Sequence, residues 1–533
     1  MSEAIAKRSW GDTIRSFGHP RVITMLFLGF SAGVPILLIF SSLSLWLGEA
    51  GVKKSAVTFF SWAALGYSFK FVWAPLVDKL PLPLLTKWLG RRRSWMLVSQ
   101  FAVIGAILWM AFTDPALGQG SLTMMAFAAV MLGFSSATQD VVIDAYRIES
   151  AQSDLQALMS STYIAGYRIG MLVAGAGALY IAHYFGTTKE AYNYSAWMNT
   201  YAIMAGVMLI GVLTTLMIPE PDEYRPDESK YTTGDYAKFF LLFILAVIGF
   251  IAVFFMSSKS GTQLGFGPFY ETVLSAKKSL TELFSNKSLA SLVVETLRLA
   301  IALLVAWLIA KGLMSSKIVN ESMVRESYLD PVKDFFRRYG VTLAWLLLAL
   351  VGFYRVSDIV LGAIANVFYQ DLGYTKLDIA NVSKVFGLWM TIIGGFAGGL
   401  LAVRFGVMRI LFLGALLSAG TNLLFILLSQ SGTNMPMLYA VIGADNLSAG
   451  LASAAFIAFL SSLTNISFTA VQYAIFSSLM TLFPKVLGGY SGTLVESMGY
   501  TNFFIMTTIL TLPVLLLIYI ASRTFKGEVT MAP

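Results

Sequence analysis

Fourteen stretches of about 20 mainly apolar residues run along the chain, and each is long enough to cross ~30 Å of hydrocarbon as an α-helix. Only 12% of the 533 residues are charged and 57% are hydrophobic, which leaves too little polar surface for a soluble protein of this length. The sequence therefore predicts an all-α integral membrane protein. The expected spans are 22–48, 55–78, 94–113, 121–144, 157–182, 197–218, 238–256, 291–310, 341–369, 376–403, 407–429, 435–462, 468–493 and 499–521.

Several classes of function lack the residues that they need. The chain has no Cys and only two His, so disulfides, zinc sites and histidine-based catalysis have no ligands or groups to use. There is no G-x-x-x-x-G-K-[ST] loop for the phosphates of ATP, and no nucleophile–base pair is visible. We therefore expect no enzyme, no cofactor, no metal site and no nucleic-acid partner.

The distribution of Lys and Arg among the loops predicts the orientation. Residues 1–21 lead into a full-length apolar stretch and lack the cleavage site of a signal peptide, so we expect a retained cytoplasmic tail. With that tail inside, the inside segments hold 23 Lys and Arg and the outside loops hold 8. Because basic loops stay in the cytoplasm, both termini are expected there.

The spans group as six, two and six. The loop after the second span contains "APLVDK" and "GRRR" within 74–93, and its counterpart in the last group is "GGLLAVRFGVMR", 398–409. Both resemble the G-x-L-a-D-r-x-G-r-r-r loop of the major facilitator superfamily, although Val403 replaces the usual acid. The resemblance implies two six-helix halves that rock about a central site, with two extra helices between them. The expected parts are the tail 1–21, the halves 22–218 and 341–521, the insertion 219–340 and the tail 522–533.

The insertion has its own features. Its two spans enclose an outside loop at 257–290, and "DPVKDFFRRYG", 330–340, predicts a short amphipathic helix that starts at Asp330-Pro331. Glu295 and Arg298 lie three residues apart, so we expect them to pair or to reach the membrane surface.

Glycine pairs at a spacing of four indicate close helix packing. They are Gly166 with Gly170, Gly394 with Gly398 and Gly395 with Gly399. Ordinary packing is one interpretation, and surfaces that slide during rocking are the other.

Four charged residues in the second half are expected at one depth. Arg355, Asp358, Lys384 and Asp445 lie roughly 12–15 Å below the outer surface at ~1.5 Å per residue. Charges within spans are costly and therefore pair or line a cavity. The four form either a permanent salt-bridge cluster or a proton-coupling site, because a carboxylate that loses its basic neighbour binds a proton more readily.

Two cations in the first half, Lys70 and Arg168, lie where we see no acid at middle depth. A buried cation needs an anion, so a substrate carboxylate is one candidate partner. Asp140 or a group of the second half is the other. The nearby Tyr163 and Tyr167 provide ring faces that suit a sugar, although aromatic side chains also serve as packing.

The stretch "SSATQDVVIDAYRIE", 135–149, predicts a gate at the inner end of its span. Asp144, Arg147 and Glu149 are expected to form ion pairs that break when the cavity opens inward, and Asp140 and Gln139, one turn deeper, are candidates for the cavity wall. The same side holds the remaining residues expected in the gate, namely Asp78, Arg91, Arg92 and Arg93.

The longest stretches resemble one family. "YSFKFVWAPLVDKLPLPLLTKWLGRRRSW", "SATQDVVIDAYRIE", "GYRIGMLVAGAGALY", "YRVSDIVLG", "VSKVFGLWMTIIGGFAGG" and residues 445–479 are similar, in order, to the AmpG-type muropeptide permeases. The resemblance implies a bacterial inner-membrane importer, driven by the proton gradient, of N-acetylglucosaminyl-1,6-anhydro-N-acetylmuramyl units and their peptides. Trp389, Asn446 and Gln472 lie in these stretches and complete the expected substrate site. We expect a monomer.

Two other functions stay open. Acetyl-CoA transporters share similar motifs, so another anionic solute is a possible cargo. A receptor with a carrier fold would use the insertion to bind a partner.

Overall fold

The computed structural model describes residues 10–52, 65–150, 153–188, 191–221, 231–257, 265–284, 287–488 and 490–524. Within these ranges the regular elements are all helices, and 13 of them are long and apolar enough to cross a membrane. They correspond to the expected spans except 55–78, whose first part, 55–64, lies outside the described residues. Its described part comprises α5 (Leu65–Phe69), the short η4 (Lys70–Val72) and α6 (Ala74–Lys79).

The chain forms two compact units, Met1–Tyr224 with Lys333–Pro533, and Arg225–Val332. The first unit contains both six-helix halves. Its first half begins with α1 (Trp10–Arg15) and contains α2 (Pro20–Leu37), η2 (Leu38–Ser42), α3 (Leu43–Glu49), α7 (Leu85–Leu89), α8 (Arg91–Ala111), α9 (Gln119–Glu149), α10 (Ser153–Leu172), η6 (Val173–Gly177), α11 (Ala178–Tyr184), α12 (Tyr194–Val207) and α13 (Leu209–Met217). Its second half contains α18 (Asp330–Phe353), α19 (Val356–Asp371), α20 (Lys376–Ile379), η10 (Ala380–Phe386), α21 (Gly387–Phe405), α22 (Val407–Gln430), α23 (Met435–Leu463), α24 (Thr469–Gly488), α25 (Ser491–Ile509) and α26 (Thr511–Thr524).

The two loops that resemble one another have the same backbone geometry at their ends. Gly90 precedes α8 with φ of 83°, and Gly406 precedes α22 with φ of 89°. A side chain at either position would be strained, because positive φ suits glycine. The third helix of each half therefore starts from an equivalent tight turn.

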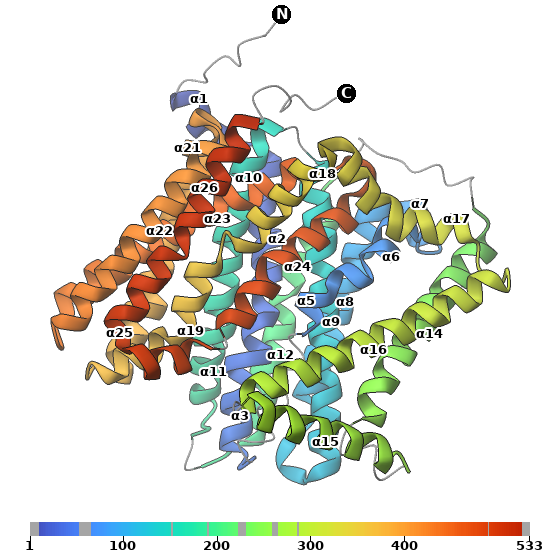
Figure 1. Cartoon of the computed structure of the whole chain (residues 1–533), viewed down its shortest axis with the longest axis horizontal. Helices are drawn as coiled ribbons and strands as arrows, with labels where there is room; N and C mark the ends of the chain where they lie inside the picture. The colour runs from blue at the N-terminus through green and yellow to red at the C-terminus, as the bar shows by residue number, and fades with distance from the viewer. Residues whose placement is uncertain are drawn as a thin grey trace, which may run out of the picture. The chain divides into compact units, whose positions relative to one another are not determined.

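Glycines bring α2 and α10 into contact along their length, and Figure 1 shows these helices side by side. A Cβ at Gly166 or Gly170 would overlap the carbonyl oxygen of Leu26 or Phe30. Gly29 and Gly33 of α2 would likewise overlap backbone atoms of α10. This close approach is the packing that the sequence predicted.

The other glycine pairs serve different contacts. Gly394 and Gly398 of α21 lie against the backbone of α23 in the same half. Gly399 instead meets Ser161 and Ala157 of α10, which belongs to the other half. Only this third pair lies where the halves face one another, so it is the one suited to a sliding surface.

The second unit contains α14 (Thr233–Met256), α15 (Gly267–Phe284), α16 (Lys287–Ser315), α17 (Glu321–Val324) and η9 (Arg325–Leu329). Arg298 pairs with Glu295 at 2.8 Å and donates to Phe254 O and Ser257 Oγ at the end of α14. The expected pair is confirmed. The helix α15 was missed, because 257–290 was interpreted as a loop.

The amphipathic helix expected at 330–340 is present as the first part of α18. The backbone of Gly340, with φ of 69°, separates it from the apolar part that follows.

A prediction follows from the close approach of α2 and α10. Gly166→Ala should lower the free energy of unfolding by about 1–3 kcal/mol, because the new methyl group overpacks a backbone contact. Gly105→Ala is the matched control, since nothing lies within 4 Å of that position in α8. The thermal midpoint of the purified variants, measured by fluorescence-detected gel filtration, checks this. Equal midpoints for the two variants would contradict it.

Candidate functional site

A buried arginine holds two carboxylates together at one end of the first unit. Arg92, at the start of α8, is 1% exposed. Its guanidinium lies 2.7 Å from Asp78 Oδ1, and it binds Glu149 with Nε at 2.9 Å and Nη2 at 2.5 Å. This two-pronged geometry is the strongest that Arg and a carboxylate form.

The second half supplies further donors to the same two acids. The backbone N–H groups of Ala470 and Val471 donate to Asp78 at 3.2 and 3.0 Å, and Thr469 Oγ1 donates to Glu149 at 2.5 Å. These residues form the first turn of α24, where free N–H groups favour an anion. We call Asp78, Arg92, Glu149 and this first turn the gate cluster. It joins the two halves.

Arg147 makes a second connection between the halves. It is fully buried and donates to Ser461 Oγ of α23 at 2.7 Å and to Ser160 Oγ at 3.1 Å. It also lies 3.3 Å from Asp144 and above the ring of Tyr473 in α24, at 5.1 Å. The gate role expected for Arg147 thus has a partner in each half. Ser461 and Thr469 were missed, because a hydroxyl in an apolar helix gives no distinct sequence signal.

The three consecutive arginines have separate contacts. Arg91 donates to the carbonyl oxygen of Asp78, and Arg92 belongs to the gate cluster. Arg93 points elsewhere and donates to the carbonyl oxygens of Thr215 and Leu216, at the end of α13. Arg93 therefore provides hydrogen-bond donors for the carbonyl oxygens at the C-terminus of α13, within its own half.

Lys70 pairs with an acid of its own half, and that acid is Asp144 rather than Asp140, which was the expected alternative to a substrate carboxylate. Its Nζ lies 3.6 Å from Asp144 Oδ2, so Asp144 is shared between Lys70 and Arg147. Asp140, one turn away, is also buried, and its Oδ1 has no hydrogen-bond partner within the described ranges. An acid with an unused oxygen next to a lysine is available to a ligand or a proton.

The other first-half candidates lie near Asp140. The rings of Tyr163 and Tyr167 lie 6.1 Å apart on α10. Gln139 is fully buried and donates to Ser31 Oγ of α2 at 2.9 Å. Its amide is therefore held between helices.

Arg168 is a cation that has no carboxylate partner among the described residues. It is partly buried on α10, and its printed contact is with Met171 Sδ at 3.9 Å. No ion pair joins it to an acid in the part of the chain that the structure describes. Arg355 of the second half is close enough for the two positive charges to repel one another.

The acids of the second half lie together. Asp358 accepts from Ser418 Oγ, and Asp445 accepts from Thr421 Oγ1 at 3.3 Å, both donors being on α22. The two carboxylates are close enough to repel one another. Arg355 approaches Asp358 only to 4.0 Å. The expected grouping holds for these three charges.

Lys384 is not part of that group. It pairs with no acid among the described residues and lines an open cavity of about 250 Å³. The expected four-charge cluster is therefore corrected to three charges, because the wider turns of η10 place Lys384 elsewhere. The cavity is also lined by Asn366, Gln370, Ile379 and Ala380.

The remaining substrate candidates have different surroundings. Asn446 accepts from Thr391 Oγ1 at 3.0 Å and so connects α23 with α21. Gln472 is 1% exposed, accepts from Arg338 at 3.0 Å and donates to Asp334 at 3.0 Å. Both polar atoms of Gln472 are engaged in the fold, and the structure does not bring it to Arg168.

Trp389 of α21 is half exposed and shares one helix face with Ile393 of α21 and Val385 of η10, both also exposed. That face is opposite the glycines that pack on α23. The structure does not bring Trp389 to the other candidates.

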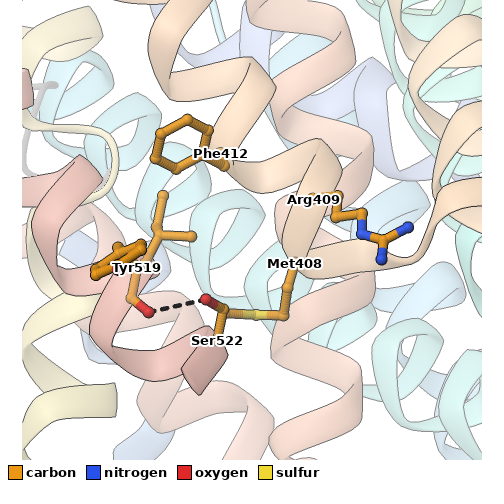
Figure 2. Close-up of a pocket in the computed structure, with 6 residues that line it drawn as sticks. Met408, Arg409, Phe412, Tyr519 and Ser522 are labelled. Carbon is orange, nitrogen blue, oxygen red and sulfur yellow. Dashed lines mark hydrogen bonds between the residues drawn. The ribbon is translucent and has the colours of Figure 1, made fainter. Parts of the chain in front are cut away.

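A separate cavity of about 270 Å³ lies between α22 and α26 (Figure 2). Met408, Phe412 and Tyr519 line it, and the Ser522 hydroxyl donates to the carbonyl oxygen of Tyr519 at 2.8 Å. The guanidinium of Arg409 points away from the other labelled side chains. None of the candidate residues lines this cavity.

The arrangement defines a class of protein: a multi-pass membrane transporter in which two six-helix halves meet at a charged contact. A solved structure supports the fold, since the proton:xylose symporter XylE, bound to 6-bromo-6-deoxy-D-glucose, superposes with a TM-score of 0.56 at 12% identity over 96% of both chains. Residues 22–325 match the model of the Major Facilitator Superfamily.

Two relatives are more specific. The putative transporter AmpG 4 of Rickettsia felis is 30% identical over 503 residues, which are 94% of this chain and 96% of that protein. The anhydromuropeptide permease of Escherichia coli K12 is 26% identical over 96% of this chain and 82% of its own length. The chain belongs to the Major Facilitator Superfamily and, within it, to the AmpG-type permeases.

Arg92 should be essential to the closed gate. Arg92→Gln leaves Asp78 and Glu149 buried without their cation, which should cost about 3–5 kcal/mol. We expect a large fall in the thermal midpoint of the purified protein. Lys87→Gln, an exposed lysine of α7, is the control and should leave the midpoint unchanged. A midpoint for Arg92→Gln equal to the control would contradict the assigned role.

Proposed function

We propose that the protein imports anhydromuropeptides, N-acetylglucosaminyl-1,6-anhydro-N-acetylmuramyl units and their peptides, together with protons. The E. coli relative is named for this substrate and aligns over 96% of this chain. The observation that carries the proposal is Arg168, a partly buried cation that pairs with no carboxylate among the described residues and lies close enough to Arg355 for their charges to repel one another. Muropeptides carry carboxylates that fit two guanidinium groups.

The gate cluster lies on the cytoplasmic side in this proposal, with both termini. The support is the excess of Lys and Arg in the loops on that side. A closed gate cluster seals the cytoplasmic end while substrate enters from outside. Rocking of the halves then breaks the contacts of Asp78 and Glu149 with α24 and opens that end.

Proton coupling is assigned to Asp358 and Asp445. Arg355 is held loosely by Asp358, at 4.0 Å, so a substrate carboxylate competes for it. When Arg355 turns to the substrate, two neighbouring acids lose their cation. One of them then binds a proton, because two adjacent carboxylates do not both stay ionised in a buried site.

Uptake into proteoliposomes tests the substrate. Labelled N-acetylglucosaminyl-anhydro-muramyl peptide should accumulate under an inward proton gradient, and unlabelled muropeptide should compete. A protonophore should abolish accumulation. No uptake by folded, inserted protein would refute the proposed substrate. Acetyl-CoA would then be tested as another anion, and ligand binding without any uptake would indicate a receptor.

Removing the acid tests the coupling. Asp445→Asn should lose gradient-driven accumulation while keeping substrate affinity within about twofold, since it removes the proton site and leaves Arg168 and Arg355 in place. Accumulation and equilibrium binding are measured on the same preparation. Normal accumulation by both Asp445→Asn and Asp358→Asn would make these acids purely structural.

Arg168→Ala tests the anion site. Loss of a charged hydrogen bond should weaken muropeptide binding by about 1.5–3 kcal/mol, or roughly 10–150-fold in Kd. Lys311→Ala is the control, because Lys311 lies over the ring of Trp307 in the other unit. Titration calorimetry gives both affinities. Equal affinities would remove Arg168 from the site.

A further inference from the structure

The insertion is connected to the first unit through two short segments, 219–221 and 333–340, and both contact the elements that carry the gate cluster. All of these contacts lie within the first unit. Each segment holds a different side of the gate cluster. One side is the start of α8 and the other is the turn before α24.

Glu220 binds the start of α8. Its Oε1 accepts from the backbone N–H of Arg92 at 2.7 Å and its Oε2 from that of Arg93 at 3.0 Å. Gly90, at the N-cap, has no side chain to do this, so Glu220 provides the cap from outside the helix. The neighbouring carbonyl oxygen of Pro219 accepts from the hydroxyl of Tyr146 on α9 at 3.0 Å. The segment thereby fixes the backbone from which Arg92 reaches Asp78 and Glu149.

Asp334 binds the other side. Its carboxylate lies 2.9 Å from Arg338 Nε and accepts from Asn465 Nδ2 at 3.1 Å and from Gln472 Nε2 at 3.0 Å. Arg338 also donates to the carbonyl oxygen of Leu463, the last residue of α23, at 3.0 Å. Asp334 is buried, so these bonds are shielded from water.

The bonds of Asp334 hold the turn that ends in the gate cluster. Asn465 and Gln472 lie on either side of Thr469, Ala470 and Val471, whose donors bind Asp78 and Glu149. The direction of those N–H groups depends on the position of this turn. Asp334 therefore acts on the gate cluster through the backbone of α24, as Glu220 does through that of α8.

We propose that Glu220 and Asp334 are positioning residues for the gate, so that the two ends of the insertion set how firmly the halves close. Neither carboxylate touches the other half's acids, and each acts through the helix that it holds. This inference goes beyond the proposed substrate and uses only the alternating-access part of the proposed function.

Alkylation of a single cysteine tests the proposal without any substrate. The chain has no Cys, so Ala474→Cys gives one reporter. Ala474 is 1% exposed on α24, one turn beyond the gate cluster, in a hydrophobic cluster that includes Ala74 and Val77 of the first half. A water-soluble maleimide reaches it only when the halves part.

Glu220→Gln and Asp334→Asn, each in this background, should raise the alkylation rate by about tenfold, the effect expected for losing one charged hydrogen bond. Glu295→Gln is the control, because that carboxylate belongs to an ion pair of the second unit, and its rate should stay at the background value. Transport should show a lower apparent affinity from outside with little change in the maximal rate.

The outcomes separate positioning from simple stabilisation. Unchanged alkylation in both variants would overturn the proposal, even if their thermal midpoints fell. If Asp334→Asn does not fold, Arg338→Gln weakens the same turn and replaces it. Because the alkylation rates are measured without substrate, they test the positioning role even if the protein does not transport muropeptides.

Discussion

The structure depends on one buried contact, in which Arg92 lies between Asp78 and Glu149 and both acids reach the first turn of α24. Such a contact adds little net stability, because the cost of removing charges from water offsets much of their attraction. That balance suits a gate, which must close specifically and still open. The glycine contacts within each half, by comparison, are close backbone packing that keeps each half rigid while it moves.

The charged residues of the two halves differ in how completely they are paired. At the gate end, buried Arg92 binds Asp78 and Glu149 of its own half, and buried Arg147 donates to Ser461 of the other half. Farther along, Arg168 pairs with no carboxylate among the described residues, Arg355 approaches Asp358 only to 4.0 Å, and Asp445 accepts a hydrogen bond from Thr421. Buried charges with partners stabilise one conformation. Buried charges without partners are sites where a ligand or a proton can bind. Binding at the second group can therefore change the equilibrium of the first, provided that the halves move as rigid bodies.

Hydropathy predicted the spans that the structure describes, and the loop signatures predicted the major-facilitator fold, because those features are local in sequence. The gate function of the charged residues stays a prediction. The partners of charged groups were less predictable. Lys70 was expected to meet a substrate carboxylate, Asp140 or a group of the second half, and it pairs with Asp144. Lys384 was expected in a cluster that it does not join. Helix rotation decides such pairings, and a π-helical segment such as η10 shifts the rotation without a sequence signal. The N–H groups of α24 were not predictable at all, since backbone donors carry no residue identity.

The most direct measurement is of two distances in one protein. Spin labels at Lys87 and Arg409, both exposed near the gate, would report the cytoplasmic end, and labels at Tyr184 and Ser431 would report the other. The account predicts that saturating N-acetylglucosaminyl-anhydro-muramyl peptide with a proton gradient lengthens the first distance and shortens the second in the same population. Distances that stay constant, or that change together in the same direction, would contradict alternating access about the gate cluster.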